Sequence, residues 1–138
     1  MTSPGTTVIR AKTLIDGNGG PPIKDPVVVI EGNEIKAVGH QEIFQPPQGP
    51  GVRELDFPQG HILPGLIDAH THLMFGTVAG QGYGEGPYEE IIERDSNEIM
   101  LLRAAHNTHI HLSAGVTTLR DCGARDRVTF DLREGARQ

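Results

Sequence analysis

Residues 62–73 have the sequence ILPGLIDAHTHL, which starts apolar and ends polar. The apolar part is typical of a strand that is buried on both faces, as the strands of parallel sheets are. His70 and His72 stand two positions apart at the polar end, and alternate side chains of a strand point to the same face. We therefore predict a buried strand that ends in two neighbouring imidazoles, with Asp68 one step earlier on the same face.

The chain after this strand alternates between loop, helix and strand patterns. A glycine-rich loop is expected at residues 76–87, a helix up to Ala114, a β-rich run at 116–121 and a second helix at 126–136. This order is the beginning of a βαβα pattern and predicts a parallel sheet with helices outside it. Two parallel strands alone are marginal, so the sequence is expected to be a truncated piece of a larger sheet.

The first of these helices carries signals at both ends. Asp95 is expected to be its N-cap, and Glu98 three residues later completes a capping box. Gly115 suits the position just past the last turn. One face of an amphipathic helix is indicated by residues at helical spacing, which are Ile99, Leu102, Ala105, His106, His109 and Leu112.

The first sixty residues have a different character, because short β-prone runs alternate with turn residues. Gly32-Asn33 separates two of these runs and indicates a hairpin. Residues 45–51, rich in proline and glycine, are expected to form a loop. The sequence thus predicts a β-rich part at 1–60 and an α/β part at 61–138. The expected strands are 6–14, 26–31, 34–39 and 52–57.

Composition narrows the class of protein further. The 138 residues carry 12 basic and 18 acidic side chains, a net charge of −6 without a basic stripe, which argues against nucleic acid or an anionic membrane as partner. Cys122 is the single cysteine, which excludes an internal disulfide and fits a reducing compartment. No run is apolar enough for a membrane span, and residues 1–5 lack the pattern of a signal peptide. We expect a cytoplasmic protein.

The two imidazoles of the 62–73 stretch suit a metal ion, since histidine nitrogen is a common ligand of zinc. Asp68 is placed to accept the second N–H of a ligating imidazole. His109 and His111 have the same spacing but lie inside the predicted helix, where residues two apart point about 200° away from each other. They are expected to be helix-surface or core-edge histidines. Only His70 and His72 are therefore predicted metal ligands.

These motifs resemble a known family. Residues 62–73 look like the first-strand motif of the amidohydrolase superfamily. The segment 115–121, GVTTLRD, resembles the second barrel strand of its imidazolonepropionase-like and Xaa-Pro dipeptidase-like branch. The β-rich opening, with Gly32-Asn33 in a hairpin, is similar to the N-terminal part of the small β-sandwich that accompanies the barrel. The resemblance covers nearly the whole chain.

The resemblance implies the start of a (β/α)8 barrel with one or two divalent metals, usually zinc, at its carboxyl mouth. His70 and His72 match the two ligands of the first strand. The implied activity is hydrolysis of a carbon–nitrogen bond, in an amide, a cyclic amide or a dipeptide-like substrate, by a metal-activated water. No residue here matches the family's bridging lysine, later histidines or catalytic aspartate. The lysines present, all in the β-rich opening, are Lys12, Lys24 and Lys36.

Two alternatives therefore stay open beside a metallohydrolase that acts on small molecules. The chain alone is expected to be inactive, and it is either a catalytically incomplete fragment or a non-enzymatic domain that binds a metal or a partner. That partner is the remainder of the barrel, supplied by a separate chain, or a second copy of this chain. A half-built parallel sheet exposes apolar edges, so the isolated monomer is expected to be poorly stable.

Four further residues have competing interpretations. Tyr83 and Glu85 lie in the glycine-rich loop, either as substrate contacts over the metal site or as part of a plain connection. Cys122 is interpreted as a buried structural thiol, because no evident base lies nearby in the sequence. Asp121 ends the second strand and is interpreted as a loop cap or a partner for Arg120 in preference to a third metal ligand.

Overall fold

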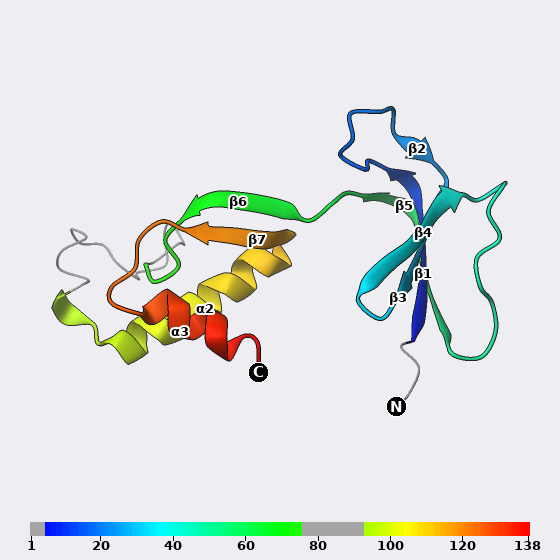
Figure 1. Ribbon diagram of the computed structural model, residues 1–138. Coiled ribbons are helices and arrows are strands. Elements are labelled where there is room, and N and C mark those ends of the chain that lie inside the picture. The colour runs from blue at the N-terminus through cyan, green and yellow to red at the C-terminus, as the bar shows by residue number, and fades with distance from the viewer. Residues whose placement is uncertain (1–4, 76–92) are drawn as a thin grey trace. The chain divides into compact units, whose positions relative to one another are not determined.

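The computed structural model describes residues 5–75 and 93–138, and the chain forms two compact units, Met1–Pro64 and Gly65–Gln138 (Figure 1). Each unit has its own sheet and its own buried cluster of apolar side chains. Within the described residues, no helix has both the length and the hydropathy that a membrane crossing requires.

The N-terminal unit is a five-stranded sheet with β1 at its centre. β1 pairs antiparallel with β2 and β3, and parallel with β5, while β4 pairs antiparallel with β3. Val8, Val27 and Val29 form its buried cluster, which fits the aliphatic, β-branched composition of these strands. The strands are β1 (Thr6–Leu14), β2 (Ile23–Lys24), β3 (Pro26–Glu31), β4 (Glu34–His40) and β5 (Val52–Ile62).

The hairpin predicted at Gly32-Asn33 is confirmed, since Glu31 of β3 pairs with Glu34 of β4 across this two-residue turn. Gly32 has φ +62°, in the left-handed region that favours glycine. β5, by contrast, continues past the predicted end at Phe57 to Ile62. Its backbone groups find partners along β1, as far as the Leu14–Ile62 pair, and this parallel partner lies almost fifty residues away in the sequence.

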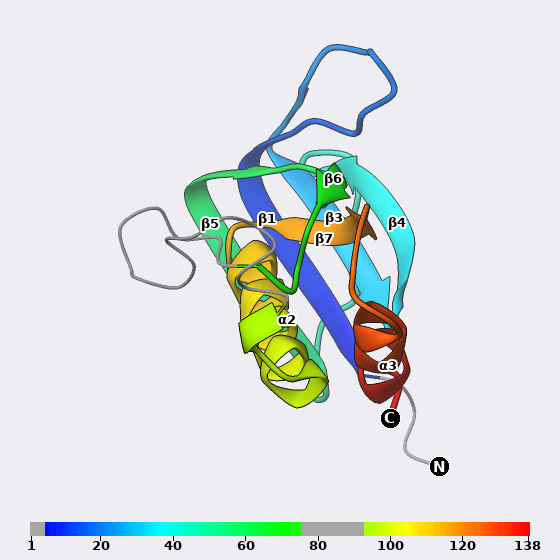
Figure 2. The same cartoon turned by 90° about the vertical axis from the view of Figure 1, so that its left-hand side faces the viewer.

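The C-terminal unit has the predicted order of strand, helix, strand and helix. Its elements are β6 (Leu66–Thr71), α2 (Asn97–Ser113), β7 (Val116–Asp121) and α3 (Val128–Gly135). β6 and β7 pair in parallel, as expected from the βαβα pattern. Figures 1 and 2 show both helices on the same side of this two-stranded sheet.

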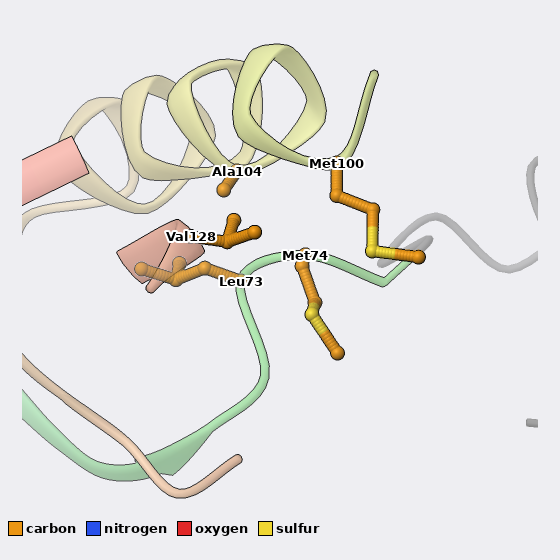
Figure 3. Close-up of a cluster of buried hydrophobic side chains, with 5 residues drawn as sticks. All are labelled: Leu73, Met74, Met100, Ala104 and Val128. Atoms are coloured by element: carbon orange, nitrogen blue, oxygen red, sulfur yellow. The ribbon is translucent and has the colours of Figure 1, made fainter. Parts of the chain in front are cut away.

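The buried cluster of this unit lies where the turn after β6 meets the two helices (Figure 3). Its members are Leu73, Met74, Met100, Ala104 and Val128, each at most 6% exposed. Truncation of a buried methionine such as Met100 to alanine typically costs about 2–5 kcal/mol. Because Leu73 and Met74 belong to this cluster, the residues that immediately follow His72 are part of the core of the unit.

The face of α2 that is buried differs from the one that the sequence pattern indicated. Met100, Ala104 and Asn107 are the buried residues of this helix. Leu102 is 72% exposed and Leu112 is 59% exposed. The short side chain of Ala104 is fully buried beside Met100, and Leu101 packs against the same cluster.

The start of α2 also differs by one position, because Ser96 is the N-cap in place of Asp95. The Ser96 Oγ accepts a hydrogen bond from the Ile99 N–H at 3.4 Å. A hydrogen bond from the Ser96 side chain lowers the pKa of Glu98 in the first turn. Asp95 is unsuited to the cap because its two carboxylate oxygens contact Arg94 and Arg103. Gly115 follows the helix with φ +88°, as predicted.

The expected burial of the 62–73 strand is wrong for this chain. Ile62 belongs to β5, and β6 begins only after Pro64-Gly65. Leu66 is 54% exposed and Ile67 is 72% exposed. The reason is that β6 pairs with one strand alone within the described residues, so one edge and part of one face remain open.

Candidate metal centre

His70 and His72 lie side by side at the carboxyl end of β6. His70 is exposed, and His72 follows the last residue of the strand and is half-buried. Their ring centroids are 5.3 Å apart, with the ring planes inclined by 73°. Two imidazoles that share one tetrahedral ion, with Zn–N bonds of about 2.0–2.1 Å, have centroids roughly 5 Å apart. The separation of the two rings therefore fits ligands of a single ion.

The His72 ring is oriented by a backbone group. Its Nδ1 lies 3.3 Å from the carbonyl oxygen of Gly123. A carbonyl oxygen can only accept, so Nδ1 carries the proton of this hydrogen bond and the neutral ring keeps the lone pair on Nε2. A second hydrogen bond that fixes the tautomer is the usual support of a metal-binding histidine. Nε2 is thus the nitrogen of His72 that is available to a metal.

Gly123 is a residue that sequence reasoning missed. A Cβ added there would lie 3.2 Å from Cε1 and 3.3 Å from Nδ1 of His72, which is tighter than ordinary contact. Glycine therefore allows the close approach of backbone and ring. Its position in the sequence, two residues after the polar end of the second strand, could have identified it as a site residue.

Asp121 joins the two segments that follow β6 and β7. Its Oδ2 accepts from the Leu73 N–H at 3.0 Å, and its Oδ1 accepts from the Gly123 N–H at 2.9 Å. The loop-cap interpretation of Asp121 is therefore the one that the contacts support. The carboxylate ties the residue after His72 to the residue whose carbonyl orients the His72 ring.

Asp68 contacts the backbone of the other predicted ligand and a helix side chain. Its Oδ1 accepts from the His70 N–H at 3.1 Å, and its Oδ2 lies 3.6 Å from Nε2 of His111. The structure thus brings Asp68 to a histidine of α2. His111 lies at the edge of the core with 16% side-chain exposure, and His109 is exposed. Both therefore match the prediction of helix-surface or core-edge histidines.

Tyr83 and Glu85, the possible substrate contacts, lie outside the described residues. Cys122 is an exposed free thiol, so the expectation of a buried one is wrong; its Sγ points along the strand end toward the carbonyl oxygens of Ala69 and Arg120.

The donor set fits part of a metal site. A catalytic zinc site uses about three protein ligands and an open position. Within residues 5–75 and 93–138, no group of three His, Cys, Asp or Glu side chains is arranged to hold an ion. The two neighbouring imidazoles, one with a fixed tautomer, are the candidate ligands in this part of the chain.

The chain is similar in sequence to known proteins. A model of the amidohydrolase family matches residues 61–138, which include both histidines. The imidazolonepropionase of Idiomarina loihiensis is 30% identical over 128 residues, covering 80% of this chain and 31% of that protein. The chain therefore spans about a third of the length of this relative.

Solved structures show the same arrangement of elements. A Xaa-Pro dipeptidase with bound methionine matches with a TM-score of 0.77 and 24% identity, over 96% of this chain and 30% of that one. Molinate hydrolase matches with a TM-score of 0.72 and 31% identity, over 99% and 28%. The fold class expected from the sequence is thereby confirmed.

Proposed function

Because this chain belongs to the amidohydrolase family, we propose that it supplies the first two metal ligands, His70 and His72, of a hydrolase that cleaves carbon–nitrogen bonds. The observation that carries the proposal is the pair of imidazoles 5.3 Å apart at the end of β6, within the segment that the family model matches. Imidazole nitrogens suit zinc, iron, nickel and copper, and of these we propose zinc, the metal of many catalytic histidine sites, with one or two ions in a complete site.

The proposed roles of the chain's own residues follow from their contacts. His70 and His72 hold the metal, and the Gly123 carbonyl keeps the proton of His72 on Nδ1. Asp121 holds the two strand-end segments together through the Leu73 and Gly123 N–H groups. A metal held by these residues would supply Lewis acidity, which would activate a water for attack on the carbonyl carbon, with the nitrogen of the carbon–nitrogen bond as the leaving group.

The proposed substrate is a small molecule with an amide, a cyclic amide or a dipeptide-like bond. Relatives named imidazolonepropionase favour the cyclic amide, since an imidazolone is one. The similarity to molinate hydrolase supports hydrolysis as the reaction.

The second candidate is a catalytically incomplete chain that binds a metal or a partner without turnover. Its supporting observation is the ligand count, because the described residues offer two imidazoles where about three protein ligands are needed. Under this alternative, hydrolysis requires the remainder of a barrel.

Metal analysis of the purified chain, with its intact mass, tests the proposal. We expect one divalent ion per chain at saturation, lost when both His70 and His72 are replaced by alanine. The matched control replaces His106 and His109, two exposed histidines of α2, and should keep the ion. Absence of bound metal in the unaltered chain, or retention in the His70/His72 variant, would contradict the proposed site. Amide hydrolysis by the chain alone would exclude the incomplete-chain alternative.

A further inference from the structure

The turn that follows His72 directs three successive carbonyl groups to side chains of α2. Asn107 is 3% exposed, and its Nδ2 donates to the carbonyl oxygen of Leu73 at 2.7 Å and to that of Phe75 at 2.6 Å. One buried amide thus bridges the two ends of the turn. The carbonyl of Met74 between them has a different donor from the same helix.

That donor is Arg103, one helical turn before Asn107. Its Nη1 donates to the Met74 carbonyl oxygen at 3.1 Å, and its Nη2 lies 2.5 Å from Asp95 Oδ2. The side chains of Arg103 and Asp95 are 12% and 8% exposed. The guanidinium is therefore fixed on one side by a buried carboxylate while its other side holds the turn.

His111 lies one helical turn after Asn107 and extends the same row to β6 itself. Its Nδ1 donates to the Asn107 carbonyl oxygen at 2.9 Å, and its Nε2 lies 3.6 Å from Asp68 Oδ2, an ion pair when both ring nitrogens carry a proton. The other oxygen of Asp68 accepts from the His70 N–H. Residues spaced by four lie on one face of a helix, so these contacts form a single polar row along α2.

We propose that this polar row, Arg103, Asn107 and His111, consists of positioning residues that fix the backbone around His70 and His72 for metal binding. The inference rests on the proposed metal site. Burying an amide and a guanidinium against this turn costs free energy unless each is hydrogen-bonded, and asparagine is a poor residue for a helix interior. Met100 and Ala104 show that apolar side chains serve for packing on the same face. The polar row is explained by the backbone that it holds.

A positioning role and a merely structural role predict different results. If Asn107 only stabilised the fold, metal affinity would follow stability in every variant. If it positions His72, its loss should weaken metal binding in a chain that is still folded. Loss of a residue that supports a metal ligand typically weakens affinity by about 10–100-fold.

The experiment titrates Co²⁺ into the 138-residue chain and follows its visible absorption, with circular dichroism to verify the fold. Asn107→Leu removes the amide at nearly constant size. Thr108→Val is the neighbouring control, because the Thr108 hydroxyl donates within the helix to the Ala104 carbonyl oxygen at 2.8 Å. Val128→Ala is the stability control, since this residue is 3% exposed in the same core and forms no hydrogen bond to the turn through its side chain.

We expect Asn107→Leu to weaken Co²⁺ binding about 10-fold or more, with Thr108→Val and Val128→Ala within about two-fold of the unaltered chain. Arg103→Met should weaken it too, and Arg103→Lys, which keeps a donor near Met74 and Asp95, should restore most of the affinity. Equal affinity in Asn107→Leu and the unaltered chain, or an equal loss in Val128→Ala, overturns the inference.

A second readout separates this inference from the proposed function. The ring nitrogens of His72 report its tautomer by NMR without any metal. If the unaltered chain binds no Co²⁺, the proposed metal site is rejected. The tautomer of the His72 ring then remains as the test of the polar row. A single Nδ1–H tautomer that becomes mixed in Asn107→Leu supports positioning, and a ring unchanged by the substitution overturns it.

Discussion

The carbonyl oxygen of Gly123 lies 3.3 Å from Nδ1 of His72, so a backbone group beyond β7 orients a side chain beyond β6. The two strands are parallel, and their carboxyl ends meet at the same edge of the sheet. The imidazole that follows one strand is thus held by the segment that follows the next strand. This relationship makes the close approach at Gly123 a requirement for the geometry of His72.

Gly123→Ala should weaken metal binding without unfolding the chain. The added Cβ would meet Cε1 and Nδ1 of His72 at 3.2 and 3.3 Å, so the ring must shift by a few tenths of an ångström. We expect a loss of affinity of about 10-fold, the lower end of what altered support of a ligand costs. Gly135→Ala is the control, because a Cβ there meets nothing within 4 Å. Unchanged Co²⁺ affinity in Gly123→Ala would show that the ring is free to move.

Gly65→Ala should destabilise the C-terminal unit. A Cβ at this position would lie 2.0 Å from Oγ1 and 2.5 Å from Cγ2 of Thr117, and a β-branched side chain has few rotamers in which to avoid it. Overpacking of this kind costs about 1–3 kcal/mol, which urea unfolding measures. Thr117→Ala removes both atoms and should recover part of the loss in the double variant. Additive effects of the two substitutions would count against the clash.

Features with a local cause were the ones that the sequence predicted well. The hairpin at Gly32-Asn33 and the helix end at Gly115 each depend on a glycine with positive φ and on its immediate neighbours. The alternation of strand and helix after residue 61 is likewise a property of short windows. The side-by-side placement of His70 and His72 was predicted by the same reasoning, since a spacing of two at a strand end is a local signal, and their role as metal ligands stays a prediction.

Features with a distant cause were missed. Leu102 is exposed and Asn107 is buried, the reverse of their hydropathy, because the carbonyl partners of Asn107 lie 34 and 32 residues away along the chain. Gly123 is 51 residues from the ring that it orients. Similarly, the second half of β5 is a strand because of its pairing with β1. Such partners are fixed by the fold as a whole, so a window of sequence does not contain them.

The carboxylate of Asp95 should make stability depend on pH in the acid range. Hydrogen bonds from Arg94 and Arg103 lower its pKa well below the ordinary 3.8. A carboxyl whose pKa falls on folding stabilises the native state above its unfolded pKa, and this contribution is lost as pH falls toward the folded value. In urea unfolding, the free energy of unfolding should therefore be higher for the unaltered chain than for Asp95→Asn at pH 7. This difference should shrink below about pH 4. Asp131→Asn is the control, because Asp131 forms an exposed ion pair with Arg127. Its free energy of unfolding should differ little from that of the unaltered chain at either pH.

The open side of β6 should make the isolated chain associate. Leu66 and Ile67 are 54% and 72% exposed on a strand that has one neighbour within the described residues, and unpaired apolar edges favour contact with another chain. We expect a mass by sedimentation that rises with protein concentration, and Ile67→Lys should shift the distribution toward monomer. Ile43→Lys is the matched control, because Ile43 is 86% exposed outside any strand and its replacement removes the same side chain from a turn. A monomer at all concentrations, or an equal effect of both lysine substitutions, would mean that β6 is not the surface through which the chain associates.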